Sequence, residues 1–371
     1  MDKNDHPYRN QPDYAFWRRA VANVADGELD PCIDEAFKID KRQRVATAGS
    51  CFAQHIGRYL RALDAGYLMT EPPHPLLTEQ AALATNYCVF TARYGNIYTS
   101  RQLLQLFDRA FGRFRPHEDL WQESDRNFID PFRPNIQPGG FNSEREFAID
   151  RDRHFRAVRE MFETLDVLVF TLGLTEAWRS RVDGAVFPIC PGVSGGVFSP
   201  KKHEFVNFGV DDVVADMRTF CERLRSVNRK ARIILTVSPV PLAATAEDRH
   251  VLVSTVYSKS VLRVACDMLE RSIANLIYFP SYEIVASGYA GRYFADDRRS
   301  VTEEGVAHVM RVFFQHFLTK SHDDKTLAGL ARRAARAIRK DTKDSDTSQA
   351  DAIRAAFQVM CDEEALDRPF D

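Results

Sequence analysis

The stretch Val45-Ala-Thr-Ala-Gly-Ser-Cys-Phe-Ala53 decides the fold, because a run suited to a buried strand passes directly into the start of a helix. Residues 44–48 are small, apolar or β-branched, which predicts a short buried strand. Residues 52–63 then repeat apolar side chains at spacings of three and four, the pattern of an amphipathic helix. Ser50 and Cys51 therefore lie at the carboxyl end of a strand, the edge where open α/β sheets bind ligands.

The same alternation of strand and helix continues along the chain. Further strands are predicted at 166–172, 232–237 and 276–279, and further helices at 153–165, 211–227, 255–272 and 302–318. The strand runs are short and nearly continuously apolar, which favours parallel strands buried on both faces. We therefore expect an α/β fold with three layers, α/β/α, around a mostly parallel sheet.

Residues 70–150 interrupt this alternation. They contain seven prolines and the turn Gly139-Gly140. Long irregular segments in compact domains are commonly functional, so we expect an irregular insertion that lines the mouth of the active site. A simple surface elaboration is the alternative.

The composition changes again after about residue 320. We expect one domain over 1–320 and a helical or flexible tail over 321–371. Within the tail, 325–340 has a basic helical pattern, 341–351 is polar and linker-like, and 352–361 has a short helical pattern. We expect the tail to be dispensable for folding.

Charge and cysteine content exclude several classes of protein. The formal net charge of −2 over 371 residues gives no electrostatic reason to expect nucleic acid as a partner. No stretch approaches the roughly 20 apolar residues that span a bilayer, and Met1–Asn10 lacks the apolar core of a signal peptide. The seven cysteines form no CxxC pair, which predicts a cytoplasmic protein with free thiols. The oligomeric state stays open.

Cys51 is the most informative single residue. The N-terminus of a helix offers unpaired N–H groups and partial positive charge, which would stabilise a thiolate or an oxyanion. Free cysteines are also common as small buried apolar residues, and this alternative stays open. The sequence contains no phosphate-binding loop, HExxH or EF-hand pattern, so we expect neither a metal nor an organic cofactor.

Gly49-Ser-Cys-Phe-Ala53 resembles the naming motif of the GSCFA family, which belongs to the wider SGNH/GDSL hydrolase group. Other stretches of the chain are similar to that family as well. They are His6-Pro-Tyr-Arg9, Phe16-Trp17, Tyr94-Gly-Asn-Ile-Tyr98, Phe132-Arg-Pro134, Phe170–Trp178, Thr236–Val240, Ser258-Lys259 and Tyr278–Tyr282. The resemblance covers about residues 6–320 and leaves the tail outside.

The resemblance implies roles for particular residues. Cys51 stands where the SGNH group has its nucleophilic serine, so it is the first choice of nucleophile, and Ser50 is the alternative. The group's oxyanion-hole glycine and asparagine imply two matching places. These are Gly95 with its neighbour Asn96, and the turn Gly173-Leu-Thr-Glu176, in which Thr175 and Glu176 follow the glycine.

The implied activity is that of an SGNH-like esterase or acyl transferase that acts on O-acyl groups of a saccharide or similar small hydroxyl compound. The group takes its base from an Asp-x-x-His element, but this chain has Asp297-Arg-Arg-Ser300. Asp297 matches the group's acid and Ser300 replaces its histidine. His55 and His308 are possible substitutes for the base. The alternative is a catalytically silent carbohydrate-binding or assembly protein that keeps the fold.

Overall fold

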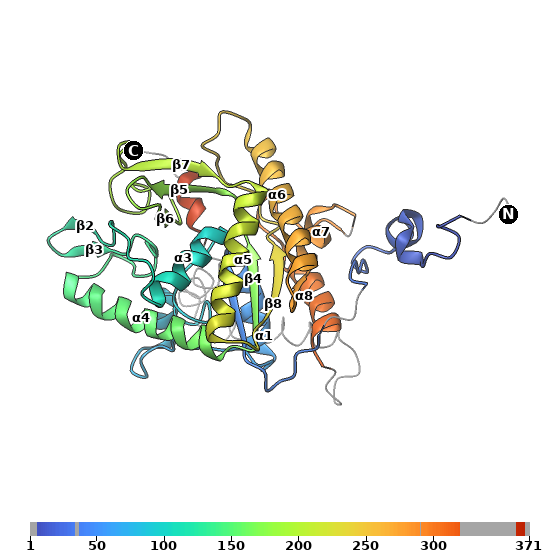
Figure 1. The fold of residues 1–371 in the computed structure, drawn as a ribbon, viewed down its shortest axis with the longest axis horizontal. Coiled ribbons are helices and arrows are strands. Elements are labelled where there is room, and N and C mark those ends of the chain that lie inside the picture. Colours follow the sequence, from blue (N-terminus) through green and yellow to red (C-terminus); the bar gives the residue numbers. More distant parts are fainter. Residues whose placement is uncertain (1–5, 34–36, 290, 320–360, 368–371) are drawn as a thin grey trace.

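The computed structural model describes residues 6–33, 37–289, 291–319 and 361–367. Its centre is a sheet of four parallel strands in the order β1-β4-β8-β9. The two middle strands, β4 and β8, are labelled in Figure 1. The strands are β1 (Val45–Gly49), β4 (Val167–Leu172), β8 (Arg232–Val237) and β9 (Leu276–Tyr278). All four strands end at the same edge of the sheet, because they are parallel.

Helices cover both faces of this sheet, as the alternation of side chains along β4 requires. Val167 and Val169 pack in one apolar cluster with α1 and α8, whereas Leu168 and Phe170 pack in another with α3, α4, α5 and α6. The helices of the first face are α1 (Cys51–Ala62), α7 (Ser281–Ala286) and α8 (Glu303–Phe317). Those of the second are α3 (Ser100–Ala110), α4 (Glu144–Thr164), α5 (Val210–Val227) and α6 (Val251–Ser272). The predicted three-layer α/β/α fold is therefore confirmed.

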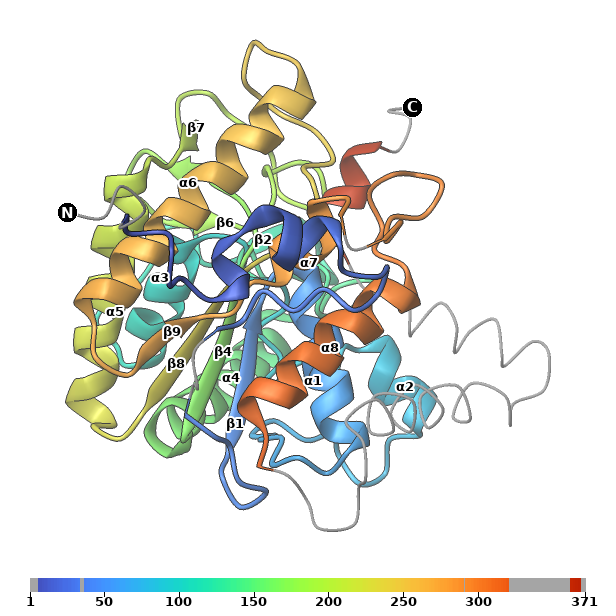
Figure 2. The same cartoon turned by 90° about the vertical axis from the view of Figure 1, so that its right-hand side faces the viewer.

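Smaller elements surround the three layers. β5 (Glu176–Ser180) pairs with β6 (Val186–Phe187) and β7 (His203–Asn207) in an antiparallel sheet, and β2 (Trp121–Ser124) pairs with β3 (Asn127–Ile129). The short helices are α2 (Glu79–Ala84), η1 (Asp13–Ala15), η2 (Arg18–Ala22) and η3 (Asp362–Asp367). Figure 2 shows η3 beside the loop that precedes α8.

The segment 70–150 has more regular structure than its prolines suggest. It contains α3, whose first turn is closed by a capping box between Thr99 and Gln102. Leu103 and Phe107 of α3 are fully buried in the main core. α4 begins at Glu144, earlier than the expected helix, and the side chain of Ser143 caps it. Part of this segment therefore belongs to the core of the domain.

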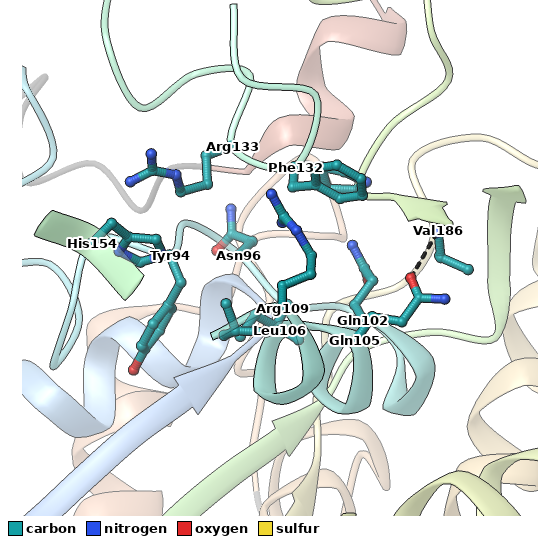
Figure 3. Close-up of a pocket in the computed structure, with 12 residues that line it drawn as sticks. Tyr94, Asn96, Gln102, Gln105, Leu106, Arg109, Phe132, Arg133, His154 and Val186 are labelled. Carbon is teal, nitrogen blue, oxygen red and sulfur yellow. Dashed lines mark hydrogen bonds between the residues drawn. The ribbon is translucent and has the colours of Figure 1, made fainter. Parts of the chain in front are cut away.

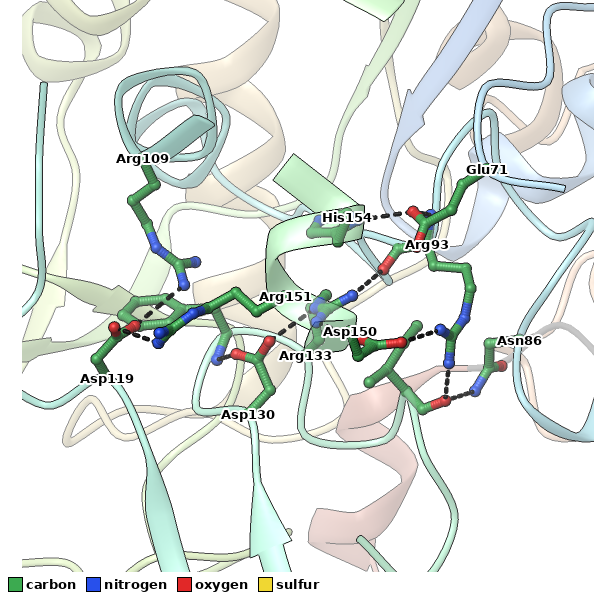
Figure 4. A network of polar contacts seen from close by, with 12 residues as sticks. Glu71, Asn86, Arg93, Arg109, Asp119, Asp130, Arg133, Asp150, Arg151 and His154 are labelled. Atoms are coloured by element: carbon green, nitrogen blue, oxygen red, sulfur yellow. Dashed lines mark hydrogen bonds and ion pairs between the residues drawn. The ribbon is translucent and has the colours of Figure 1, made fainter. Parts of the chain in front are cut away.

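Buried ion pairs hold the rest of this segment in place (Figure 4). The Arg133 guanidinium lies 2.7 Å from Oδ2 of Asp130 and 2.9 Å from Oδ2 of Asp150. The Arg93 guanidinium lies 2.6 Å from Oδ1 of Asp150. Arg93, Asp130 and Arg133 are almost inaccessible to water. Buried charges are tolerated when they are paired in this way.

Within the described ranges, no helix is both long and apolar enough to cross a bilayer. Most of the predicted tail lies outside the described residues, including 325–340, 341–351 and all of 352–361 except Cys361. The described part of the tail is residues 361–367, which we call the C-terminal segment.

Candidate active site

The candidate site lies where β1 and β4 end. The Ser50 N–H donates to the Thr171 carbonyl at 3.0 Å, which continues the pairing of the two strands. The segment of chain before α3 joins this edge, because the Ile97 N–H donates to the Gly49 carbonyl at 2.8 Å. The Gly173 N–H donates to the Tyr98 carbonyl, also at 2.8 Å. The predicted motif at residues 49–51 and the turn at Gly173 thus meet at the carboxyl edge of the sheet.

Two glycines permit this close approach. Gly49 has φ +138°, and a β-carbon there would overlap the Thr171 carbonyl oxygen. A β-carbon on Gly173 would lie 2.9 Å from Cβ of Ser50. Any larger residue at either position would push the two strand ends apart.

Cys51 is the first residue of α1 and is only 4% exposed. Its thiol shares a hydrogen bond with Cys361, and this bond together with burial raises the pKa of Cys51 well above its usual value. The same bond, with the nearby Arg299 guanidinium, lowers the pKa of Cys361 to about 6. The adjacent Ser50 hydroxyl is buried and has no hydrogen-bond partner among the described residues.

Lys259 is a site residue whose role the motif analysis did not assign. Its Nζ donates to the Gly173 carbonyl at 2.6 Å, and the side chain is fully buried. Burial lowers the pKa of Lys259 to about 8, although interactions with Glu363 and Cys51 act to raise it. The sequence carried a signal for it, because Lys259 falls on the same face of α6 as the buried residues Leu262 and Cys266. A lysine on an apolar helix face needs a partner.

Asn96 reaches the site from the loop before α3. Its Oδ1 accepts a hydrogen bond from Nε2 of Gln54 on α1 at 3.0 Å, and its Nδ2 donates to Asp362 at 3.0 Å. Gly95 precedes it with φ +69°, which turns the chain there. Figure 3 looks into a cavity of about 30 Å³ beside Asn96, which Phe132 and Arg133 also line. This cavity holds about one water molecule.

Thr175 and Glu176 form hydrogen bonds with residues other than Cys51. The Thr175 hydroxyl donates to Oδ1 of Asn207 at 2.6 Å, while the Glu176 carboxylate accepts from the Thr245 hydroxyl at 2.7 Å. Burial raises the pKa of Glu176. Both residues adjoin or line a larger and mainly apolar cavity of about 250 Å³. Its walls include Leu174, Glu176, Trp178, Phe187, Phe205 and Leu242, together with Glu363 and Leu366 of the C-terminal segment.

Asp297 organises its own turn. Its Oδ1 accepts from the N–H groups of Arg299 and Ser300 at 2.9 Å each, and its Oδ2 accepts from the Ser300 hydroxyl at 2.5 Å. Burial alone would raise the pKa of Asp297, but these hydrogen bonds together outweigh it and lower the pKa. The turn directs Arg299 to Cys361, 3.2 Å from its sulfur, and to Glu363, 3.0 Å from Oε2. The residue of this element that reaches the cleft is thus Arg299.

The two candidate histidines lie in other surroundings. His308 uses both ring nitrogens, one with the Tyr293 hydroxyl and one with the Leu29 carbonyl, each at 2.7 Å. The His55 ring packs edge-on against Phe52, and burial lowers its pKa to about 3. Among the described residues, no hydrogen bond or ring contact joins either histidine to Cys51, so neither histidine stands in the geometry of a base.

One group of side chains in the described ranges has the donor set of a metal site. Asp30, Cys32 and His316 are half-buried, and His316 lies 2.8 Å from Asp30. Burial and the nearby acids raise the pKa of Cys32 to about 12, so its thiol is protonated at neutral pH. A protonated thiol is a poor metal ligand.

Comparison with known protein families gives a match. The model of the GSCFA family matches residues 44–313, which span β1 to most of α8 and include Cys51, Asn96, Gly173, Lys259 and Arg299. The C-terminal segment lies beyond it. No curated protein matches the chain.

Proposed function

Because the chain belongs to the GSCFA family, we propose that it is an SGNH-like esterase or acyl transferase with Cys51 as its nucleophile. Its substrate is an O-acyl group on a carbohydrate or similar hydroxyl compound. The proposal rests mainly on one observation. A thiol begins a helix at the carboxyl edge of a parallel sheet, beside a buried lysine whose pKa is lowered to about 8.

Lys259 is the group we propose for proton transfer. An amine with a pKa near neutrality can take the proton of a neighbouring thiol and return it later. The Cys51 sulfur then attacks the ester carbonyl carbon, forming a C–S bond while the carbonyl oxygen becomes an oxyanion. When the C–O bond breaks, the leaving oxygen takes the proton from Lys259. Water or a second hydroxyl compound then attacks the thioester carbon and gives its proton to Lys259. The C–S bond breaks, the acyl group leaves on the new oxygen, and the Cys51 sulfur takes the proton back from Lys259.

Two kinds of donor support the oxyanion in this proposal. The N-terminus of α1 provides backbone N–H groups and the positive end of its dipole. Asn96 provides an amide N–H in the place of the asparagine of the SGNH group, because its Nδ2 carries two N–H groups and one of them serves the bond to Asp362. Gly173 and Thr175 contribute less, because the N–H of the first and the hydroxyl of the second already donate within the domain.

The apolar cavity beside the site suggests which acyl groups are accepted. Its volume of about 250 Å³ and its mainly aliphatic and aromatic walls suit a hydrocarbon chain better than an acetyl group alone. A cytoplasmic location remains part of the proposal, on the basis of the scattered free cysteines.

A silent carbohydrate-binding or assembly protein is the second candidate. The observation that favours it is the pairing of Asp297 with Ser300, where the SGNH group has its histidine. A role of Lys259 as a base distinguishes the esterase from the silent protein, because a silent protein has no need of a buried amine beside the thiol.

Hydrolysis of p-nitrophenyl esters of increasing chain length and of acetylated sugars tests the proposal. We expect Cys51→Ala to lower turnover by about 10³-fold or more and Lys259→Met to lower it by about 10²-fold or more. Cys88→Ala is the matched control, because Cys88 is a half-buried free cysteine whose contact with Arg61 is made by its backbone carbonyl and not by its thiol. Equal turnover in the wild type and in Cys51→Ala would remove Cys51 as nucleophile. No turnover with any ester, in the wild type and in Asp362→Ala alike, would favour the silent protein.

A further inference from the structure

The C-terminal segment places an acidic side chain in the candidate site, and donors without charge hold it there. The Asp362 carboxylate accepts from Nδ2 of Asn96 at 3.0 Å, from the Tyr98 hydroxyl at 3.2 Å and from Nδ2 of Asn135 at 2.6 Å. The Tyr98 oxygen also accepts from the Asp362 N–H at 2.9 Å. Asn96, Tyr98 and Asp362 are all buried. Both carboxylate oxygens therefore have partners in a site closed to water.

The domain builds this cradle without help from the segment. Asn96 is oriented by Gln54 of α1, which donates to its Oδ1 and so leaves the amide N–H₂ facing the carboxylate. Tyr98 is fixed through its carbonyl, which accepts from Gly173. Asn135 belongs to the loop held by the buried ion pairs of Figure 4. The donors thus stay in position if another carboxylate replaces that of Asp362.

The cradle adjoins the nucleophile. The Tyr98 hydroxyl lies 3.9 Å from the Cys361 sulfur. Ile97, between Asn96 and Tyr98, donates its N–H at 2.8 Å to the carbonyl of Gly49, two residues before Cys51. A ligand that put its carboxylate in the cradle would bring neighbouring atoms to the Cys51 thiol. While the C-terminal segment is in place, however, Cys51 is buried beneath it.

We propose that Asn96, Tyr98 and Asn135 form a carboxylate-binding subsite of this active site, which Asp362 fills from within the chain and a sugar acid fills in its place. That the ligand is a carbohydrate rests on the proposed function. That it carries a carboxylate rests on the contacts of Asp362. Amide and phenol donors also bond sugar hydroxyls, so they suit a ligand that carries both groups. Since the occupant is part of the same chain, its effective concentration is about millimolar or more, and a free ligand must compete with that.

Alkylation of Cys51 by iodoacetamide, followed by mass spectrometry on the full chain, measures whether the subsite is occupied. We expect Asp362→Ala to alkylate about tenfold faster than the wild type, because hydrogen bonds to a charged group are lost. Asn135→Ala should act in the same direction from the domain side. Equal rates in the wild type and both variants, with unchanged melting curves, would overturn the proposal.

Glucuronate and glucose then form a matched pair of probes, since they differ by the carboxylate. In Asp362→Ala, we expect glucuronate to slow the alkylation of Cys51 and glucose to leave it unchanged. Protection by glucuronate should disappear in the double variant Asp362→Ala/Asn135→Ala. Equal protection by the two sugars overturns the proposal, and so does protection by an acetylated Asp-Glu-Glu peptide alone. None of these measurements needs turnover, so their outcome is independent of the esterase assay.

Discussion

The pKa values of two buried glutamates in this protein are shifted in opposite directions. Burial alone raises the pKa of Glu71, but His154, Arg133 and the Arg93 N–H outweigh it and lower that pKa to about 2. Burial and the Cys361 thiolate raise the pKa of Glu363 to about 8, although Arg299 lies 3.0 Å away. The first glutamate is a charge that its surroundings stabilise. The second is a carboxyl group that its surroundings keep mostly protonated at neutral pH.

The surroundings of the two glutamates also differ in which parts of the chain supply them. The insertion network consists of Glu71, Arg93, Asp130, Arg133, Asp150 and His154, all within the part of the chain that matches the family. The cleft cluster consists of Lys259 and Arg299 from the same part, and Cys361, Asp362 and Glu363 from beyond it. A network that closes within the domain supports the fold. A cluster closed by a distant segment can open without unfolding the domain.

Removing a central charge of the insertion network should have the largest effect on stability. Arg133→Ala leaves Asp130 and Asp150 buried with one partner fewer, and a buried pair broken on one side costs about 3–5 kcal/mol. Urea unfolding followed by circular dichroism measures this loss. The control is Arg126→Ala, an exposed arginine of the same segment, for which we expect a change within about 0.5 kcal/mol. Equal midpoints for the two variants would contradict a structural role of the network.

Glu71 should make stability depend on acid. Its folded pKa of about 2 lies below an unfolded value of about 4.3, so its contribution is complete above about pH 4.3 and disappears as the pH falls through about 2. The size is about 3 kcal/mol, from a difference of roughly two pKa units. Burial lowers the pKa of His154, so near neutrality His154 supports Glu71 by a hydrogen bond rather than by charge.

Glu71→Gln should therefore flatten the curve of unfolding free energy against pH between about 4.3 and 2. Glu160→Gln, on the exposed face of α4, is the control and should leave the curve as steep as in the wild type. A curve for Glu71→Gln as steep as that of the control would show that other carboxyls dominate acid unfolding.

The local sequence pattern predicts the central sheet but not every helix around it. The strand runs and the turn at residues 49–51 predicted the sheet and the edge at which residues 49–51 and Gly173 meet, because strand length, apolarity and small residues are local properties. The prolines of 70–150 concealed α3, whose capping box and apolar spacing were nevertheless present in the sequence. Asn96 and Gly173 were found through motifs.

The cleft cluster could not be predicted in the same way. Asp362 reaches Asn96 across 266 residues, and no periodicity or motif spacing records such a contact. Lys259 was visible as a charge on an apolar face, but its partners were not. The tail was expected to be dispensable for folding, and this stays a prediction. What the sequence did not indicate is that its residues 361–367 contact the candidate site.

Substitutions of Asp297 should have the smallest effect on stability. They distinguish the role of its charge from its role in holding the turn that positions Arg299. Its carboxylate bonds the N–H groups of Arg299 and Ser300 and is exposed to water, so its loss should cost at most about 1 kcal/mol. Asp297→Asn keeps an acceptor for both N–H groups and should leave the turn, the melting temperature and the alkylation rate of Cys51 near wild type. Asp297→Ala removes the acceptor, so Arg299 loses its support and Cys51 should alkylate several-fold faster, with Asp296→Asn as the neutral control. A large loss of esterase turnover in Asp297→Asn, with an unchanged alkylation rate, would instead assign the carboxylate charge to the chemistry.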